Sequence, residues 1–291
     1  MNNVKLLLCD EITALKTLPE HSIALAILKP PHSFTKENNG GPELEEIEAK
    51  LPMKELFDEL TRVLKPHSVA LVFGGGPKTS LFIKNQNIEQ YRYDLYWDRQ
   101  FPSIHDHVYK SRNIPLAVIE PISVFSELAP RLYPEHAEHH HHWHDETPTH
   151  DNKHCLDSWT HGWSEPGCFA HHYDFPITKI TVPTGHHSHW HEDEFGAFPV
   201  ELIKYLIRLY SVKNETILIP FAGTMNGVIA GIETVRNVVA IESNPDAFII
   251  GRNRIDKIIA HKADYFLDWV DCREDQTKPL PDDPEGLGGK D

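Results

Sequence analysis

The stretch that most constrains the fold is Ile23–Leu28, an uninterrupted apolar run followed by Lys29 and then by Pro30 and Pro31. Apolar runs of this length are typical of strands buried on both faces of a parallel sheet. Proline cannot continue the hydrogen-bond ladder, so the backbone must leave the sheet at its carboxyl edge. Open α/β sheets bind their ligands at that edge. The sequence therefore predicts a functional site here, with Lys29 and His32 flanking the two prolines.

Composition places the chain among soluble globular proteins. It has 291 residues with 40% hydrophobic content, which suits one large α/β domain that carries an insertion. No apolar stretch approaches the ~20 residues of a membrane-spanning helix, and the first residues lack the layout of a signal peptide. We therefore expect an intracellular, soluble protein with no membrane partner.

Charge and cysteine content narrow the functional classes. The formal net charge of -15 argues against a general nucleic-acid coat protein, because such a chain repels a polyanion at long range. A local basic groove is compatible with that charge. The cysteines form no CxxC pair, so we expect reduced thiols and neither a disulfide framework nor a zinc knuckle. They are Cys9, Cys155, Cys168 and Cys272.

Strand and helix signals alternate along most of the chain. A helical pattern at residues 43–64 ends at Lys65 and Pro66, and a buried strand follows at residues 69–73. This crossover unit favours a parallel sheet. The sequence thus predicts an α/β, Rossmann-like fold with a doubly wound, mostly parallel sheet. Further strands are expected at residues 4–8, 91–97, 119–126, 215–219 and 237–241, and further helices at residues 15–19, 81–87, 228–234 and 247–259 and after Pro199.

The last third of the chain has the pattern of a nucleotide-binding half. The strand at residues 215–219 leads into a turn with Pro220, Phe221 and Gly223, and a helix and a further strand follow. The further strand ends at Glu242. In Rossmann-type halves, an acid at this place accepts hydrogen bonds from ribose hydroxyls.

One modestly basic stretch, residues 99–112, has aromatic neighbours at Trp97, Phe101 and Tyr109. Cationic side chains beside aromatic ones are suited to track a nucleic-acid backbone and to stack bases. Its candidate nucleic-acid contacts are Arg99, Lys110 and Arg112. A solvated loop without a ligand is the alternative interpretation.

Between residues 134 and 194 the composition changes abruptly, and this segment holds 15 of the 21 histidines. Neutral imidazoles at this density suit zinc or nickel, with cysteine thiolates as further ligands. Weak opportunistic binding, or surface histidines without a metal, is the alternative. The candidate metal ligands are His139, His141, His144, Cys155, Cys168, His187, His189 and His191.

Taken together, the order of these elements resembles the S-adenosylmethionine-dependent DNA amino-methyltransferases of the permuted, beta-type motif order. These enzymes methylate adenine N6 or cytosine N4. The resemblance covers residues 4–259 except the histidine-rich segment, and it implies a methyltransferase fold. It rests on Leu-Thr-Arg-Val-Leu-Lys-Pro at residues 60–66, Tyr-Trp-Asp at 96–98, Val-Phe-Ser at 124–126, the helix after Pro199, and Pro-Phe-Ala-Gly at 220–223.

The resemblance also divides the chain into four parts. Residues 1–133 form the catalytic-motif half of one methyltransferase-like domain, and residues 195–270 form its cofactor-motif half. The histidine-rich segment 134–194 lies where the family places its target-recognition region. Residues 271–291 form an acidic, flexible tail.

The catalytic tetrapeptide departs from the family pattern. The family has Asp/Asn/Ser-Pro-Pro-Tyr/Phe/Trp, and this chain has Lys29-Pro30-Pro31-His32. The family's first residue accepts a hydrogen bond from the target amino group, whereas an ammonium has three donors and no acceptor. It would also lie near the sulfonium of the cofactor, and like charges ~4 Å apart repel by ~4 kcal/mol at an effective dielectric of ~20. His32 remains able to stack on a flipped base.

The cofactor motif departs as well. Ile219 stands where the family has an aspartate before Pro-Phe-x-Gly, so the acidic partner of the cofactor's ammonium is missing. Met225 follows in a turn that relies on close backbone approach, and we expect its bulk to crowd the cofactor. The family segment His-Pro-Thr-x-Lys-Pro corresponds to residues 194–199, which read Glu-Phe-Gly-Ala-Phe-Pro. Gly223 and Glu242 remain as cofactor contacts.

These departures favour a catalytically inactive methyltransferase-like protein that binds DNA or a protein partner. The first alternative is an active DNA adenine-N6 or cytosine-N4 methyltransferase that uses S-adenosylmethionine. The second is a metal-binding or structural assembly subunit in which the histidine-rich segment is the functional part. The sequence leaves open whether the chain forms a homo-oligomer.

Overall fold

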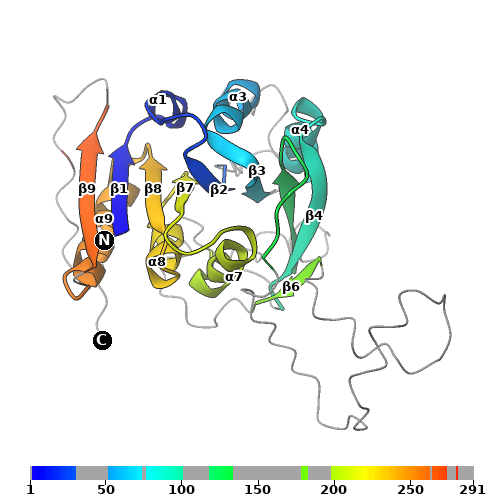
Figure 1. The fold of residues 1–291 in the computed structure, drawn as a ribbon. Coiled ribbons are helices and arrows are strands. Elements are labelled where there is room, and N and C mark those ends of the chain that lie inside the picture. Colours follow the sequence, from blue (N-terminus) through cyan, green and yellow to red (C-terminus); the bar gives the residue numbers. More distant parts are fainter. Residues whose placement is uncertain are drawn as a thin grey trace, which may run out of the picture.

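The computed structural model describes residues 2–30, 52–73, 77–100, 118–133, 178–182, 198–262, 264–273 and 280. These residues form one nine-stranded sheet with the strand order β6-β4-β5-β3-β2-β7-β8-β1-β9 (Figure 1). The strands are β1 (Asn2–Leu8), β2 (Ile23–Leu28), β3 (Leu64–Phe73), β4 (Tyr91–Asp98), β5 (Ile119–Phe125), β6 (Lys179–Thr181), β7 (Thr216–Pro220), β8 (Asn237–Glu242) and β9 (Tyr265–Asp271). The helices are α1 (Glu11–Lys16), α3 (Met53–Val63), α4 (Pro77–Gln86), α7 (Val200–Tyr210), α8 (Asn226–Glu233) and α9 (Pro245–Ile259).

Strand β2 lies at the centre of the sheet, between β3 and β7, and runs parallel to both. Leu25 pairs with Val69 on one side and with Ile217 on the other. All six residues of β2 are buried, as the uninterrupted apolar run predicts. In the described sheet only β5 runs antiparallel to its neighbours. The predicted α/β fold with a doubly wound, mostly parallel sheet is therefore confirmed.

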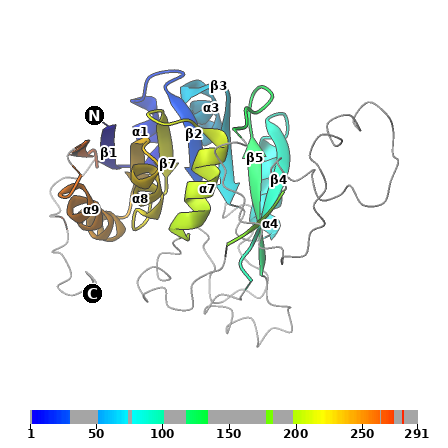
Figure 2. The same cartoon turned by 60° about the horizontal axis from the view of Figure 1, so that its bottom comes forward.

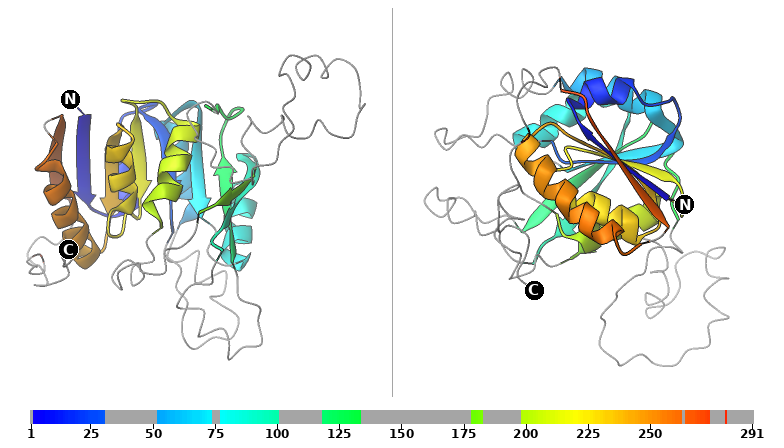
Figure 3. Two further views of the ribbon diagram at one scale, coloured as in Figure 1. Left: turned by 90° about the horizontal axis from the view of Figure 1, so that it is seen from below. Right: turned by 90° about the vertical axis from the view of Figure 1, so that its left-hand side faces the viewer.

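Helices cover both faces of the sheet (Figure 3, right). Helices α1, α3 and α4 lie on one face and α7, α8 and α9 on the other, and α7 and α8 pack side by side (Figure 2). Successive residues of a strand point to opposite faces. Leu25 and Ile27 accordingly pack into the core under α7, whereas Ala26 and Leu28 pack into the core under α3.

The chain reverses its direction across the sheet between β2 and β7. From β2 it continues through α3 to β3 on one side, and from β7 it continues through α8 to β8 on the other. Helices α3 and α8 lie on opposite faces of the sheet, so the topological switch point lies at the carboxyl ends of β2 and β7. In open α/β sheets, this topological switch point is where ligands bind.

Several elements differ from the sequence-based expectation: α1 and β3, for example, begin earlier than expected, at Glu11 and Leu64. Helix α3 begins at Met53, directly after Pro52 at its N-cap with φ -69° and ψ 79°. The earlier part of the predicted helical stretch, residues 43–51, lies outside the described residues. Strand β9 was not predicted, because it lies at the sheet edge and its buried and exposed residues do not alternate cleanly. Strand β6 was not predicted either. It comes from the 134–194 segment, is three residues long, and pairs with β4.

Among the helices of the described ranges, none combines the length and the apolar character needed to cross a bilayer.

Candidate functional site

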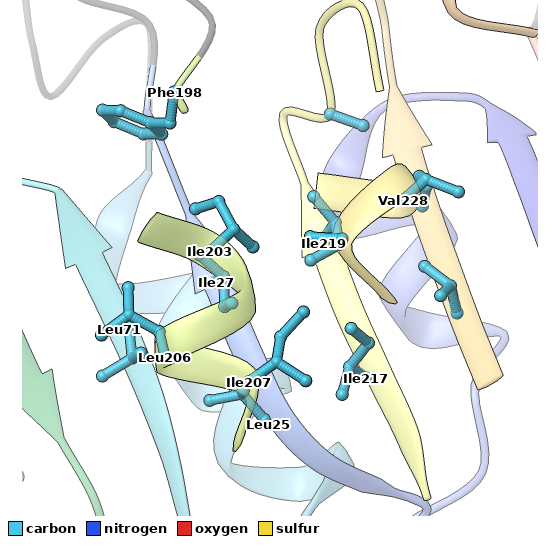
Figure 4. Close-up of a cluster of buried hydrophobic side chains, with 14 of the residues drawn as sticks. Leu25, Ile27, Leu71, Phe198, Ile203, Leu206, Ile207, Ile217, Ile219 and Val228 are labelled. Carbon is cyan, nitrogen blue, oxygen red and sulfur yellow. The ribbon is translucent and has the colours of Figure 1, made fainter. Parts of the chain in front are cut away.

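A cavity lies at the switch point, with an empty volume of about 460 Å³ including its open mouth. Its apolar walls come from Ile27 of β2, Ile203 of α7 and Ile219 of β7, and Phe198 lies at the carboxyl end of the strands (Figure 4). The remaining described lining residues are Lys29, Pro220, Phe221, Ala222, Gly223, Thr224, Asn226 and Gly227. The cavity therefore joins the end of β2 to the turn between β7 and α8.

That turn is tight, and the side chain of Glu242 is hydrogen-bonded to its backbone. Phe221, Gly223 and Met225 all have positive φ values, of 55°, 53° and 71°. Glu242 lies at the end of β8, and its carboxylate accepts hydrogen bonds from the backbone N–H of Gly223 at 2.6 Å and of Asn244 at 2.8 Å. Burial raises the pKa of Glu242, and these backbone hydrogen bonds oppose the shift. The predicted nucleotide-type turn and its acid are thus adjacent in space.

Met225 does not crowd the cavity, so the expectation from the sequence is wrong on this point. Its side chain is fully buried and is not among the described lining residues. It packs under α9, where an added Cβ on Gly251 would overlap the Met225 Cγ. The left-handed backbone conformation directs the side chain into the core, and Gly251 leaves room for it.

Ile219 is 6% exposed and lies against the first turn of α8. Its Cγ2 is 2.9 Å from the position that a Cβ on Gly227 would take. Ile219 lines the cavity, and the family has an aspartate at this sequence position. This part of the cavity wall is therefore uncharged.

Two buried polar atoms at the cavity have no hydrogen-bond partner among the described residues. They are the Oγ1 of Thr224 and the Oδ1 of Asn226, whose residues are 3% and 6% exposed. The Asn226 amide group is held in place because its Nδ2 donates to the Phe198 carbonyl at 2.9 Å. Buried polar atoms are hydrogen-bonded in nearly all folded proteins. Both residues line the cavity, so its wall contains two polar groups without a described partner.

Glu11 is a buried acid near Glu242 that the sequence reasoning missed. It is the first residue of α1, close to Glu242, because β1 and β8 are neighbours and Leu8 pairs with Glu242. It is 7% exposed, and its Oε1 has no partner in the described ranges. Burial raises its pKa to about 8, with smaller contributions from the charges of Glu242 and Asp10. The available signal was an acid directly after the first strand, at the same sheet edge as Glu242.

The raised pKa of Glu11 predicts that the protein loses stability as pH rises. Between its unfolded value of 4.5 and its folded value of about 8, the folded chain keeps a proton that the unfolded chain has lost. The free energy of unfolding therefore falls through this window, by on the order of a few kcal/mol. Glu11→Gln should flatten this dependence and raise the melting temperature near pH 8 but not near pH 5.

Urea unfolding at several pH values measures this effect. The exposed Glu20 offers a matched control, since Glu20→Gln should leave the pH dependence of stability unchanged. Some dependence should remain in Glu11→Gln, because burial also raises the pKa of Glu242. Equal slopes for Glu11→Gln and the wild type would contradict the assignment.

At the end of β2, Lys29 lies against an aromatic cluster. Its Nζ is 4.2 Å from the centre of the Phe198 ring. Phe198 stacks on Phe73 at 3.8 Å between ring centres, and Trp97 meets it edge-on at 5.7 Å. Glu120 of β5 is near as well: burial raises its pKa, and the charges of Lys29 and Arg99 oppose that shift. Lys29 is thus a cation over an aromatic face, with a carboxyl group close enough to interact with its charge.

The structure describes only some of the other predicted site residues. Pro30 is buried after Lys29, whereas Pro31 and His32 lie outside the described residues. Arg99 follows β4, and its guanidinium carbon is 5.8 Å from the centre of the Trp97 ring. The charges of Arg99 and Lys29 both act on Glu120. Lys110 and Arg112 lie outside the described residues.

None of the predicted metal ligands lies in the described ranges, so the structure does not test the zinc or nickel site. These residues are His139, His141, His144, Cys155, Cys168, His187, His189 and His191. Within the described ranges, no group of three or more histidine, cysteine or acidic residues is arranged to hold a metal. Cys9 and Cys272 are both free thiols.

Comparison with known proteins agrees with this geometry. The fold resembles the cytosine-N4-specific PvuII DNA methyltransferase with a TM-score of 0.60 and 16% identity, over 92% of this chain and 95% of that one. It also resembles a Thermus thermophilus protein assigned as a DNA modification methylase, with a TM-score of 0.59, 20% identity, and coverage of 92% and 99%. A structure of that protein with S-adenosyl-L-methionine matches with a TM-score of 0.58, 20% identity and the same coverage.

No curated protein sequence matches the chain. The family model for DNA methylases of the N6/N4 type, however, matches residues 23–251, which is most of the chain and includes β2, the cavity and Glu242. This chain therefore belongs to the N6/N4 DNA methylase family, the DNA amino-methyltransferases that its sequence resembles.

Proposed function

We propose that this chain is a catalytically silent member of its family, which binds DNA without methylating it. The observation that carries the proposal is the contact between Lys29 and Phe198. Both residues stand where the sequence departs from the family pattern: a lysine replaces the acidic or polar residue, and a phenylalanine replaces a lysine. The two substituted residues contact each other, which supports a site in which a cation has replaced the original catalytic group.

The surroundings of Lys29 stabilise its positive charge. The face of an aromatic ring attracts a cation, and the Glu120 carboxylate lies near on the other strand. An ammonium in this place donates hydrogen bonds and accepts none. It therefore cannot accept a hydrogen bond from a target amino group, which is the task that the family assigns to this position.

S-adenosylmethionine, the cofactor of the family, fits only half of the cavity. Glu242 and the Gly223 turn suit its ribose, since a carboxylate at a strand end accepts from ribose hydroxyls. Its amino-acid half carries an ammonium and a sulfonium, and these would meet the apolar Ile219 and the positive Lys29. We therefore expect the cofactor to bind weakly or not at all.

DNA is the partner that the family membership supports. Arg99 follows the end of β4, at the same carboxyl edge of the sheet as Lys29, and the charges of both side chains act on Glu120. Such side chains position a protein on phosphates. If DNA does not bind, we expect the binding partner to be a protein.

A methyl-transfer assay and a binding assay together test the proposal. With labelled S-adenosylmethionine and mixed-sequence DNA, the wild type should transfer no methyl groups above background. Duplex DNA should bind in fluorescence anisotropy, and its affinity should fall with salt. Arg99→Ala should weaken this binding more than Arg92→Ala, because Arg92 is exposed at the opposite end of the same strand.

Two results would overturn the proposal. Methyl transfer that disappears in Lys29→Ala would establish an active enzyme with a lysine at its centre. Absence of DNA binding at low salt would exclude DNA as the partner and favour a protein.

A further inference from the structure

The cavity at the switch point has a charge pattern of its own. Among the described residues that line it, Lys29 is the one charged side chain, and none is acidic. Glu120 lies near Lys29 but is not one of the described lining residues. The cavity wall thus carries a positive charge, which favours an anionic group on the ligand.

The opposite wall offers hydrogen-bond donors. Asn226 and Gly227 line the cavity from the first turn of α8, an eight-residue helix. First-turn N–H groups have no acceptor inside their own helix, and the helix dipole favours an anion there. The Thr224 hydroxyl, 3% exposed and without a partner among the described residues, stands in the same turn as a further donor.

The third feature is Glu242 at the end of β8, which is not one of the described lining residues but is hydrogen-bonded to the backbone of Gly223, which is. Each oxygen of Glu242 accepts one backbone hydrogen bond and keeps capacity for a second. Strand β8 is two places from β2 in the sheet, which separates the two strand ends by ~10 Å. A ribose hydroxyl and the 5′-phosphate of the same nucleoside, with one hydrogen bond at each end, span a distance of this order.

From these three features we propose that the cavity binds a ribonucleoside 5′-phosphate. Glu242 accepts from the ribose hydroxyls, and the phosphate lies between Lys29, the Thr224 hydroxyl and the first turn of α8. The same residues disfavour a sulfonium at the 5′ position, because two positive charges in one cavity repel each other. The change from an acidic or polar residue to Lys29 therefore makes the cavity favour an anion.

This inference goes beyond the proposed function. It concerns the ligand of the cavity and not DNA. Methyl transfer, DNA binding and nucleotide binding are measured in separate assays, so a negative result in one leaves the other two predictions standing.

Isothermal titration of the full chain tests the inference, with AMP, GMP, CMP and UMP as probes. We expect at least one of them to bind, and to bind at least ~10-fold more tightly than the nucleoside without its phosphate. S-adenosylmethionine should bind more weakly than the preferred nucleotide. Lys29→Met should reduce the affinity for the nucleotide at least ~10-fold and leave the affinity for the nucleoside unchanged.

Two further variants separate the contacts. Glu242→Gln should weaken the nucleotide and the nucleoside by the same factor, because both carry the ribose. Lys65→Met is the matched control, since Lys65 lies at the amino end of β3, pairs with Glu215 at 2.9 Å, and should not affect nucleotide affinity. Melting temperatures verify that each variant is folded.

Three results would overturn the inference: no binding of any of the four nucleotides, equal affinity for nucleotide and nucleoside, or unchanged nucleotide affinity in Lys29→Met. Tighter binding of S-adenosylmethionine than of every nucleotide would also overturn it.

Discussion

Gly251→Ala is expected to destabilise the protein by ~1–3 kcal/mol, although alanine is the better helix former. Gly251 lies in α9 under the turn that builds the cavity. A Cβ there would overlap the Met225 Cγ and would lie 3.1 Å from the Met225 Cβ and 3.2 Å from the Thr224 carbonyl carbon. Met225 is fully buried, so it has no open space into which it can move. Urea unfolding followed by circular dichroism measures the loss.

A double-mutant cycle identifies the cause. Met225→Ala alone should cost ~2–5 kcal/mol, because it removes a fully buried side chain. In the Gly251→Ala background the same change should cost at least ~1 kcal/mol less, since the added methyl then occupies part of the space. Additive costs would contradict the direct overlap. Gly251→Ala should also weaken ligand binding, because Thr224 belongs to the displaced turn.

Arg236→Met is expected to cost ~3–5 kcal/mol, a large loss for a single polar side chain. Arg236 is 3% exposed. Its guanidinium donates to the Ser211 carbonyl at 2.7 Å, to the Ser211 hydroxyl at 3.2 Å and to the Thr234 carbonyl. Ser211 and Thr234 are the C-cap residues of α7 and α8, so one side chain ties the ends of both helices together.

The size of the loss follows from what the substitution leaves behind. Methionine fills much of the volume but leaves the Ser211 and Thr234 carbonyl oxygens without their donors in a buried place. Burial lowers the pKa of Arg236 to about 10, and the nearby Arg208 adds to the shift. Arg236→Lys should lose less than Arg236→Met, since an ammonium keeps some of the donors but not the planar fork.

The exposed Arg92 provides the control for Arg236. Its guanidinium makes one hydrogen bond, to the Glu127 carbonyl at 2.6 Å, and Arg92→Met should change the free energy of unfolding by less than ~1 kcal/mol. If Arg236→Met costs no more than Arg92→Met, the buried guanidinium does not hold the two helix ends together.

The central strand and the cofactor-type turn were predictable from the sequence because their signals are local. Six consecutive apolar residues before two prolines suffice to predict the buried strand β2 and its end. Likewise, the strand, turn, helix and strand that end at Glu242 follow one another in the chain. Strands β6 and β9 lie at the two edges of the sheet, where burial leaves a weaker pattern.

The effect of Met225 was not predictable in the same way. Its direction depends on a left-handed backbone conformation and on Gly251, a residue of the following helix that the local sequence does not connect with it. Glu11 was missed for a similar reason. Its burial and its raised pKa arise because β1 and β8 are neighbours in the sheet, although they are distant in the chain.

The sequence by itself determined the fold class, the family, and the replacement of an acidic or polar residue by Lys29 at the end of β2. Each of these depends on residue types and their order. The tertiary structure alone decided what that lysine meets, namely the ring of Phe198, the nearby Glu120 and a cavity whose described lining is otherwise uncharged. These groups come from strands and loops far apart in the chain, and the strand order brings them to one edge. The charge of a site is a property of that assembled edge, and no single stretch of the sequence contains it.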